Sequence, residues 1–104
     1  NLIFTVSNEG YLYVLDKYKG DIIRVSDIFK FYKKKNRKNI NPVGFVVGNT
    51  NLYLTSSDGK LIVISLNDGN VKRVEKVSSE VISEPFIFNS NLFLLRNGSI
   101  IQYD

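Results

Sequence analysis

The segment "KFYKKKNRKN" (30–39) concentrates the side chains with the strongest chemical character in the chain. It holds six cations within nine positions: Lys30, Lys33, Lys34, Lys35, Arg37 and Lys38. Cations this close together attract phosphate groups, an anionic membrane surface or an acidic patch on a protein. Phe31 and Tyr32 lie beside them and could stack on such a partner or insert into it. These six positions are therefore the candidate site for an anionic partner.

The same segment has a plain alternative explanation. The chain is rich in Lys, Asn, Ile, Phe and Tyr and contains no Ala, which is the composition expected from an AT-rich gene. A lysine run is then a solvated loop insertion that costs the fold little. The net charge of the whole chain is +4, so the residues outside the segment are mildly acidic. This argues against nucleic acid as the partner, because nucleic acid needs a broad cationic face.

The remaining residue types exclude most catalytic chemistry. Without Cys or His there is no thiol nucleophile, no disulfide, no Ser-His-Asp set and none of the usual zinc or iron ligand sets. No glycine-rich phosphate loop or calcium-loop spacing is present. Asp16 and Asp104 both fall six residues after a turn glycine, which predicts a repeated turn-capping role rather than a catalytic pair. The "NGS" at 97–99 matches a glycosylation acceptor, but an Asn-Gly turn explains it. We expect no enzyme activity and no cofactor.

A repeated sequence pattern predicts the elements that position these residues. Three stretches open with Asn-Leu and end in a turn glycine: "NLIFTVSNEG" (1–10), "NLYLTSSDG" (51–59) and "NLFLLRNG" (91–98). Each is followed by a second apolar stretch: "YLYVLD", "KLIVIS" and "SIIQYD". In the first two copies another glycine, Gly20 or Gly69, precedes a third stretch. Pro42 and Pro85 each lead a further apolar stretch ahead of the second and third copies.

These stretches are short, rich in Val, Ile, Leu, Phe and Tyr, and bounded by Gly, Asn, Asp and Ser, as is typical of strands and turns. Asp58-Gly59 and Asn97-Gly98 suit tight hairpins. Stretch 26–36 is expected to be a loop, so the fold is all-β. Aromatic residues inside the strands are expected to pack in the core between repeats: Phe4, Tyr13, Phe45, Tyr53, Phe86, Phe88 and Phe93.

Four short antiparallel strands that recur about every 40 residues are the pattern of a β-propeller blade. The chain would form about two and a half blades, with three, four and three strands, in repeats 1–40, 41–83 and 84–104. The glycine spacing is longer in the first interval because the basic loop 30–39 is inserted there.

"GYLYVLDKYKGDIIRV" (10–25) and "GKLIVISLNDGNVKRV" (59–74) resemble the repeat of the PQQ-like, quinoprotein-type propellers. The matching positions are Gly10, Leu12, Tyr13, Leu15, Asp16 and Gly20 in the first copy, and Gly59, Leu61, Ile64 and Gly69 in the second. Arg24 and Arg73 stand where that family has tryptophan, and Val14 and Val63 where it has alanine.

This resemblance implies a non-catalytic scaffold module with protein partners, in kind like the lipoprotein propeller of the outer-membrane β-barrel assembly machinery. It implies a periplasmic or cell-envelope location. The alternative is a piece of a quinoprotein dehydrogenase or of a sugar-binding propeller. A dehydrogenase would need the tryptophan, and often a cysteine pair, that this chain lacks.

The ends of the chain give a last expectation. The chain begins with Asn1 rather than Met, which indicates a processed product or an excised piece, and no apolar run approaches the roughly 20 residues of a membrane span. The outermost strands would have unpaired edges, and the outermost blades would have bare apolar faces. We expect these edges or faces to be covered by the rest of a propeller or by self-association.

Overall fold

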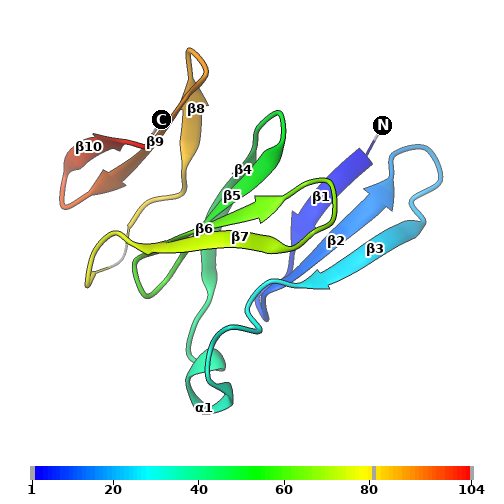
Figure 1. The fold of residues 1–104 in the computed structure, drawn as a ribbon, viewed down its shortest axis with the longest axis horizontal. Coiled ribbons are helices and arrows are strands. Elements are labelled where there is room, and N and C mark those ends of the chain that lie inside the picture. Colours follow the sequence, from blue (N-terminus) through cyan, green and yellow to red (C-terminus); the bar gives the residue numbers. More distant parts are fainter. Residues whose placement is uncertain (1, 81, 104) are drawn as a thin grey trace.

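A computed structural model describes residues 2–80 and 82–103 (Figure 1). Within them the chain forms three antiparallel sheets of three, four and three strands, as the repeat predicts. The first sheet has the order β1 (Leu2–Val6), β2 (Tyr11–Asp16), β3 (Ile22–Asp27). The middle sheet has the order β4 (Pro42–Val47), β5 (Asn51–Ser56), β6 (Lys60–Ser65), β7 (Val71–Lys76). The third sheet comprises β8 (Phe86–Phe88), β9 (Asn91–Arg96) and β10 (Ser99–Gln102), with β9 in the centre.

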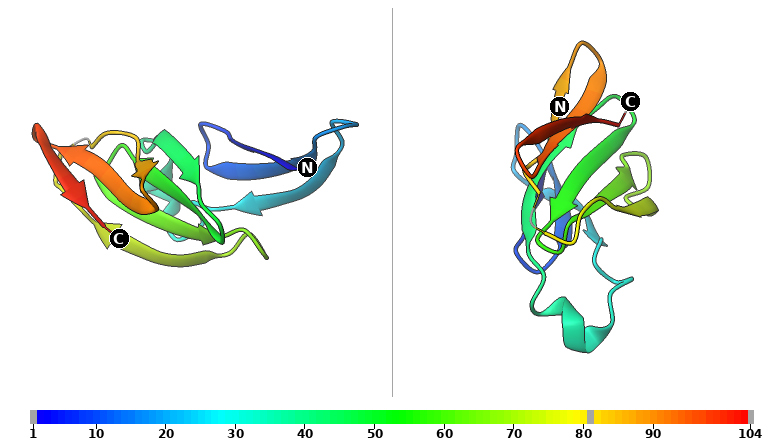
Figure 2. Two further views of the ribbon diagram at one scale, coloured as in Figure 1. Left: turned by 90° about the horizontal axis from the view of Figure 1, so that it is seen from above. Right: turned by 90° about the vertical axis from the view of Figure 1, so that its left-hand side faces the viewer.

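The three sheets lie side by side in chain order, and the middle sheet is packed on both faces (Figure 2). Side chains alternate along its strands, so Leu52 and Leu54 pack toward the first sheet, whereas Tyr53 between them packs toward the third. On β6, Ile62 and Ile64 face the first sheet and Leu61 and Val63 face the third, and all four are fully buried. The strand pattern of the sequence therefore encodes two separate cores, one at each junction between sheets.

In each of the first two repeats, the turn glycine accepts a hydrogen bond from the connection that leaves the sheet. The connection after β3 crosses the β1–β2 turn, where the amide of Ile28 donates to the carbonyl of Gly10 at 3.0 Å. The connection after β7 crosses the β5–β6 turn in the same way, with the amide of Val77 donating to the carbonyl of Gly59 at 2.8 Å. Both glycines have positive φ. The first and middle sheets are thus each fastened to their own outgoing connection by the same contact.

The predicted hairpins at Asp58-Gly59 and Asn97-Gly98 are both present, with different lengths. Asn97 and Gly98 form a two-residue loop with φ of 51° and 78°, the primed turn that Asn-Gly favours. Asp58 and Gly59 belong to the three-residue loop 57–59, in which only Gly59 has positive φ.

The turn-capping role predicted for Asp16 is confirmed. Its carboxylate accepts the amide of Tyr18 at 3.1 Å, and Ser65, the equivalent residue of the next repeat, accepts the amide of Asn67 at 3.2 Å. Asp104, predicted to do the same, lies outside the described residues.

Two expectations from the sequence are wrong. Stretch 26–36 is not all loop, because one helical turn, α1 (Lys34–Arg37), begins inside it. Lys and Arg are good helix formers, and a tertiary contact of Arg37, described below, fixes the turn despite the clustered charge.

The expectation of buried aromatic residues fails on β8, and Tyr13 on β2 likewise lies outside both cores of the described residues. Phe88 is 64% exposed and Phe86 39% exposed, although Phe86 stacks on Phe93 with ring centroids 5.6 Å apart. The third sheet has a neighbour on one face only, so these rings lie on its uncovered face.

Candidate functional site

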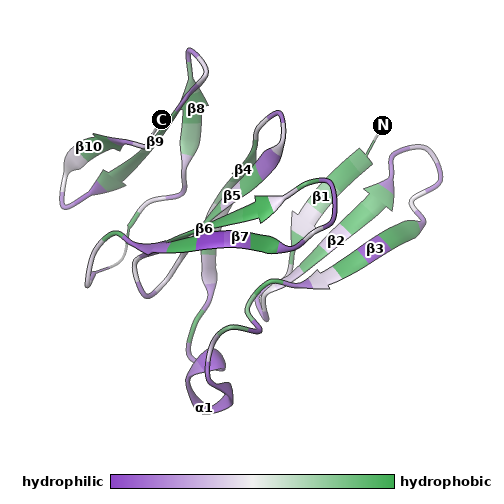
Figure 3. Cartoon of the chain, viewed as in Figure 1, coloured by the Kyte–Doolittle hydropathy of each residue, from purple (hydrophilic) through white to green (hydrophobic). Residues whose placement is uncertain are grey.

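The basic insertion, residues 30–39, joins β3 to β4 and projects from the end of the sheets as α1 and its flanks (Figure 1). In Figure 3 this turn is the most hydrophilic part of the chain. Five of the six predicted cations are exposed: Lys30, Lys33, Lys34, Lys35 and Lys38. The structure therefore places these lysines together on one solvated projection.

Arg37, the sixth predicted cation, has a different role. Its Nη1 donates to Asp27 Oδ2 at 2.9 Å, its Nη2 contacts Asp27 Oδ1, and the guanidinium lies 5.3 Å from the centre of the Tyr11 ring. Nη2 also donates to the carbonyl of Glu9 at 3.3 Å. The hydrogen bond to Asp27 is the main cause of a raised pKa for Arg37. Arg37 thus fastens α1 to the first sheet, so the free charge of the insertion comes from its lysines.

A hollow of about 490 Å³ lies beside α1. Lys34, Arg37 and Lys38 line one part of it, and residues of the β1–β2 turn and of the approach to β4 line the rest: Asn8, Glu9, Ile40 and Asn41. The sequence did not predict this hollow because its walls come from three segments. The side-chain amides and the two exposed lysines suit a carboxylate, while Glu9 limits how much negative charge the hollow accepts.

Tyr32 fastens the other end of the insertion to the middle sheet. Its hydroxyl donates to the Asp58 carboxylate at 2.8 Å, and the hydroxyl of Ser56 donates to the same carboxylate. Lys60 Nζ lies 2.8 Å from Asp58 Oδ2 and 4.4 Å from the centre of the Tyr32 ring. The insertion is therefore held by Arg37 on the first sheet and by Tyr32 on the middle one.

The pKa values of this cluster agree with a structural role. Burial is the largest cause of the raised pKa of Tyr32, and the neighbouring Asp58 adds to it. Burial alone would raise the pKa of Asp58, but hydrogen bonds from Lys60, Ser56 and Tyr32 outweigh it, and the pKa is lowered. At neutral pH the cluster is a neutral phenol beside a paired carboxylate. Neither group is poised to transfer a proton near pH 7.

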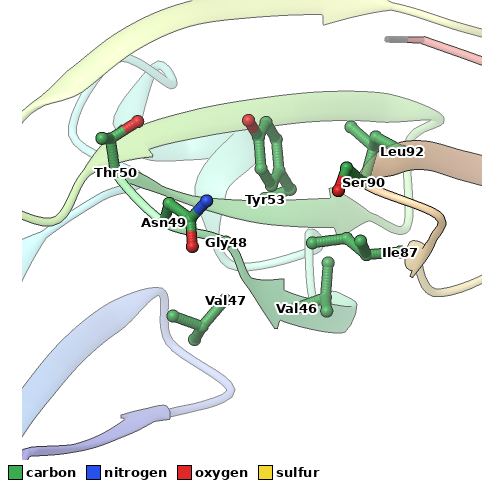
Figure 4. A pocket seen from close by; sticks show the side chains of 9 residues that line it. All are labelled: Val46, Val47, Gly48, Asn49, Thr50, Tyr53, Ile87, Ser90 and Leu92. Atoms are coloured by element: carbon green, nitrogen blue, oxygen red, sulfur yellow. The ribbon is translucent and has the colours of Figure 1, made fainter.

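A second hollow, also of about 490 Å³, lies between the middle and third sheets (Figure 4). Its lining comes from β4, loop 48–50, β5, β8, turn 89–90 and β9, and includes no Asp, Glu, Lys or Arg. Val46, Ile87 and Leu92 give it apolar walls, and the side chains of Asn49, Thr50, Tyr53 and Ser90 contribute polar groups. Such a lining can hold a neutral group but offers no charged side chain for catalysis or ion binding.

Across residues 2–80 and 82–103, no group of three or more Asp or Glu side chains is placed to hold a metal ion. The same residues contain no helix long and apolar enough to cross a membrane.

Arg24, at the position where the PQQ-like repeat has tryptophan, clamps the first sheet to the middle sheet. Its Nη1 donates to the carbonyl of Asn67 and its Nη2 to the carbonyl of Leu66, each at 3.0 Å. Arg73 occupies the same position one repeat later, but its Nε pairs only with Glu75 at 2.9 Å, and both of these side chains are more than a third exposed.

This difference gives a prediction with a built-in control. Replacing Arg24 by alanine removes two charge-assisted bonds to turn carbonyls and is expected to lower the free energy of unfolding by about 2 kcal/mol. The equivalent replacement Arg73→Ala removes an exposed ion pair and is expected to cost less than about 0.5 kcal/mol. Urea unfolding of the two variants measures the difference, and equal losses would show that the Arg24 bonds contribute nothing specific.

Comparison with known proteins identifies the fold. No protein-family model and no curated protein matches the chain. Among solved structures, the WD40 β-propeller domain of Doa1 matches 97% of this chain with a TM-score of 0.70 at 14% identity. Sqt1 from Saccharomyces cerevisiae matches 99% with a TM-score of 0.79 at 14% identity. BamB from Moraxella catarrhalis matches 97% with a TM-score of 0.68 at 13% identity. The chain has the fold of part of a β-propeller, and residues 2–80 and 82–103 form about two and a half of its blades.

These likenesses show the fold alone. The chain spans only 28% to 32% of the length of the three structures. The glutaminyl cyclase of Myxococcus xanthus is also similar, with a TM-score of 0.63 at 13% identity over 44% of its length. An enzyme is therefore among the structures that share this arrangement of strands.

Proposed function

We propose that the chain is a non-catalytic protein-interaction module of the PQQ-like propeller type, and that the basic insertion binds an acidic protein surface. The observation that carries the proposal is the anchoring of this insertion at two points. Arg37 fixes it to Asp27 of the first sheet and Tyr32 fixes it to Asp58 of the middle sheet. A merely tolerated loop needs no such anchors. An anchored loop presents its lysines in a fixed arrangement, so less freedom is lost when a partner binds.

The PQQ-like assignment rests on the repeat, and the structure supports it at its glycines. Gly10 and Gly59 lie in β-turns, and Gly20 and Gly69 lie in the following turns, all with positive φ. A place in the bacterial cell envelope, among scaffold propellers, follows from the same resemblance. The similarity to BamB supports only the propeller fold on which this proposal rests.

An acidic protein fits the surroundings of the insertion better than a dense array of phosphates. Glu9 lies in the hollow beside Lys34 and Lys38, and Asp27 already neutralises Arg37. Two carboxylates offset two of the six cations, and the remaining four positive charges are distributed over the insertion, which suits the spaced carboxylates of a protein surface.

The test replaces Lys33, Lys34, Lys35 and Lys38 by glutamine and leaves Arg37 in place, so that α1 keeps its anchor. Binding of a labelled polyglutamate peptide is followed by fluorescence anisotropy at low salt. We expect the affinity to fall by roughly tenfold or more, because close cations act together at low ionic strength. The loss should shrink as salt is added.

The control variant replaces four exposed lysines elsewhere, Lys17, Lys19, Lys72 and Lys76, and changes the net charge by the same amount. We expect it to retain most of the affinity. Equal losses of affinity in both variants would mean that only the net charge matters. An unchanged affinity in the first variant would mean that the insertion is a solvated loop without a binding role. Vesicles with anionic lipid form a second arm, and a stronger effect there than with the peptide would favour a membrane partner instead.

A further inference from the structure

The hollow between the middle and third sheets is formed by two consecutive sheets whose facing sides are both present. β4, β5 and loop 48–50 line it from the middle sheet, and β8, β9 and turn 89–90 line it from the third. Ile87 and Leu92 are paired across β8 and β9, so they lie on the side of the third sheet that packs toward the middle sheet. The hollow is therefore part of a junction that the chain makes within itself.

The polar side chains of this lining are uncharged, and each of them can both donate and accept hydrogen bonds. They are the amide of Asn49 and the hydroxyls of Thr50, Tyr53 and Ser90. Figure 4 shows Asn49 and Thr50 on one side of Tyr53 and Ser90 on the other. The Tyr53 hydroxyl accepts a hydrogen bond from Asn51 Nδ2 at 3.4 Å, which leaves its own proton for another acceptor.

The turn that carries Ser90 has a side chain where glycine would suit the backbone better. Asn89 and Ser90 form a two-residue loop with φ of 51° and 65°. The loop Asn97-Gly98 has nearly the same conformation, with φ of 51° and 78°, and has glycine at the second position. A Cβ is sterically unfavourable in this left-handed region, and glycine avoids the cost. The chain therefore has a serine hydroxyl at the hollow against the preference of the turn.

Gly48 departs from local preference in the opposite direction. It is not among the residues with positive φ, so its backbone conformation does not require glycine, and glycine adds flexibility that folding must remove. An added Cβ would lie 3.2 Å from Tyr53 Cε2 and 3.7 Å from Ile87 Cδ1, two side chains that line the hollow. Glycine thus keeps this space open. Local preferences that are overruled in this way are expected where a site has a function.

The lining determines which class of ligand fits. A charged ligand would lose its water without gaining an opposite charge, because no Asp, Glu, Lys or Arg lines the hollow. A purely apolar ligand would leave the amide and the hydroxyls without partners. A sugar ring has an apolar C–H surface and several hydroxyls that both donate and accept. The first suits Val46, Ile87 and Leu92, and the second suit the polar side chains.

We propose that this hollow binds the ring of a neutral sugar, with the Ser90 hydroxyl among its hydrogen-bonding partners and Gly48 leaving room for the ring. The volume of about 490 Å³ is within the range of small-molecule sites, roughly 300–1,000 Å³. This binding activity goes beyond the proposed protein interaction. It does not rest on the basic insertion, none of whose residues lines the hollow.

The test is a titration of the ¹⁵N-labelled chain, followed by the NMR shifts of its backbone amides. The probes are D-glucose and D-galactose, each compared with its uronate, which has the same ring with a carboxylate. We expect at least one of the two neutral sugars to shift the amides of Gly48, Asn49 and Ser90, with a dissociation constant on the order of 1 mM. Its uronate is expected to bind roughly tenfold more weakly, because the hollow offers the carboxylate no cation.

Two variants test the named residues. Ser90→Gly removes the hydroxyl and relieves the turn, so it is expected to weaken sugar binding roughly fivefold and to raise the melting temperature by roughly 4 °C. Gly98→Ser makes the reverse exchange at the equivalent turn, outside the hollow. It is the matched control, and it should lower the melting temperature without changing the sugar affinity. Gly48→Val fills the hollow and is expected to abolish the shifts, with circular dichroism to confirm that the variant is folded.

Three results would overturn the proposal. The first is the absence of shifts at Gly48, Asn49 and Ser90 with both neutral sugars up to about 50 mM. The second is a uronate that binds as tightly as its neutral sugar, and the third is an unchanged sugar affinity in Ser90→Gly or in folded Gly48→Val. Binding of the polyglutamate peptide is expected to be the same in these variants as in the unmodified chain, so failure here and failure of the basic insertion can be told apart.

Discussion

Replacing Gly59 by alanine is expected to lower the free energy of unfolding by about 3 kcal/mol, a large part of the stability of a chain this small. Gly59 has a φ of +80°, and the added Cβ would lie 2.0 Å from the carbonyl oxygen of Ser78 and 2.7 Å from that of Glu80. An alanine in this conformation costs about 1 kcal/mol by itself. The rest comes from displacing the connection after β7, whose amides at Val77 and Ser78 both donate to the Gly59 carbonyl.

Gly98 provides the matched control for this prediction. It has nearly the same φ, +78°, but no atom lies within 4 Å of its added Cβ. Gly98→Ala should therefore cost only the conformational part, about 1 kcal/mol. Thermal unfolding followed by circular dichroism separates the variants, with melting temperatures expected to differ by roughly 10 °C. If both variants lose the same stability, the close approach at Gly59 has no energetic importance.

The sequence predicted most of the fold because strands and hairpin turns are encoded locally. Alternating apolar residues and the Asn-Gly and Asp-Gly pairs each depend on a few neighbouring positions, and they set three sheets with the predicted strand counts. The repeat also identified Gly10 and Gly59 as equivalent. It could not show why they are glycines, since the atoms above them belong to connections about 19 residues further along the chain.

The candidate site was predicted only in part, because its anchoring contacts also join residues that are far apart in the sequence. Lysine clustering is visible in the sequence, and the exposure of five lysines agrees with it. The pairing of Arg37 with Asp27, which removes one predicted cation and creates α1, spans ten residues and depends on the path of the connection. The bond from Tyr32 to Asp58 joins the insertion to the middle sheet across 26 residues. No local pattern distinguishes this tyrosine from the exposed Phe31 beside it.

That bond leads to a second prediction of large effect. Asp58→Ala is expected to lower the free energy of unfolding by about 3 kcal/mol. Without the carboxylate, the hydroxyls of Tyr32 and Ser56 and the ammonium of Lys60 lose a shared partner in a partly buried place. The basic insertion should also loosen, which amide exchange across residues 28–33 would report. Asp68→Ala is the control, because Asp68 is an exposed turn aspartate that bonds only to its own turn, at the amide of Asn70.

The effect of Asp58 should depend on pH in a defined direction. The pKa of Asp58 is lowered in the folded chain, so folding favours the charged carboxylate. Its contribution is present above the pKa of an unfolded aspartate, about 3.9, and is lost as the pH falls below this value through the folded pKa. The gap in unfolding free energy between the unmodified chain and Asp58→Ala should be constant from about pH 5 to 8 and should narrow below about pH 4. A gap that stays unchanged down to about pH 2 would mean that the hydrogen bonds at Asp58 do not need its charge.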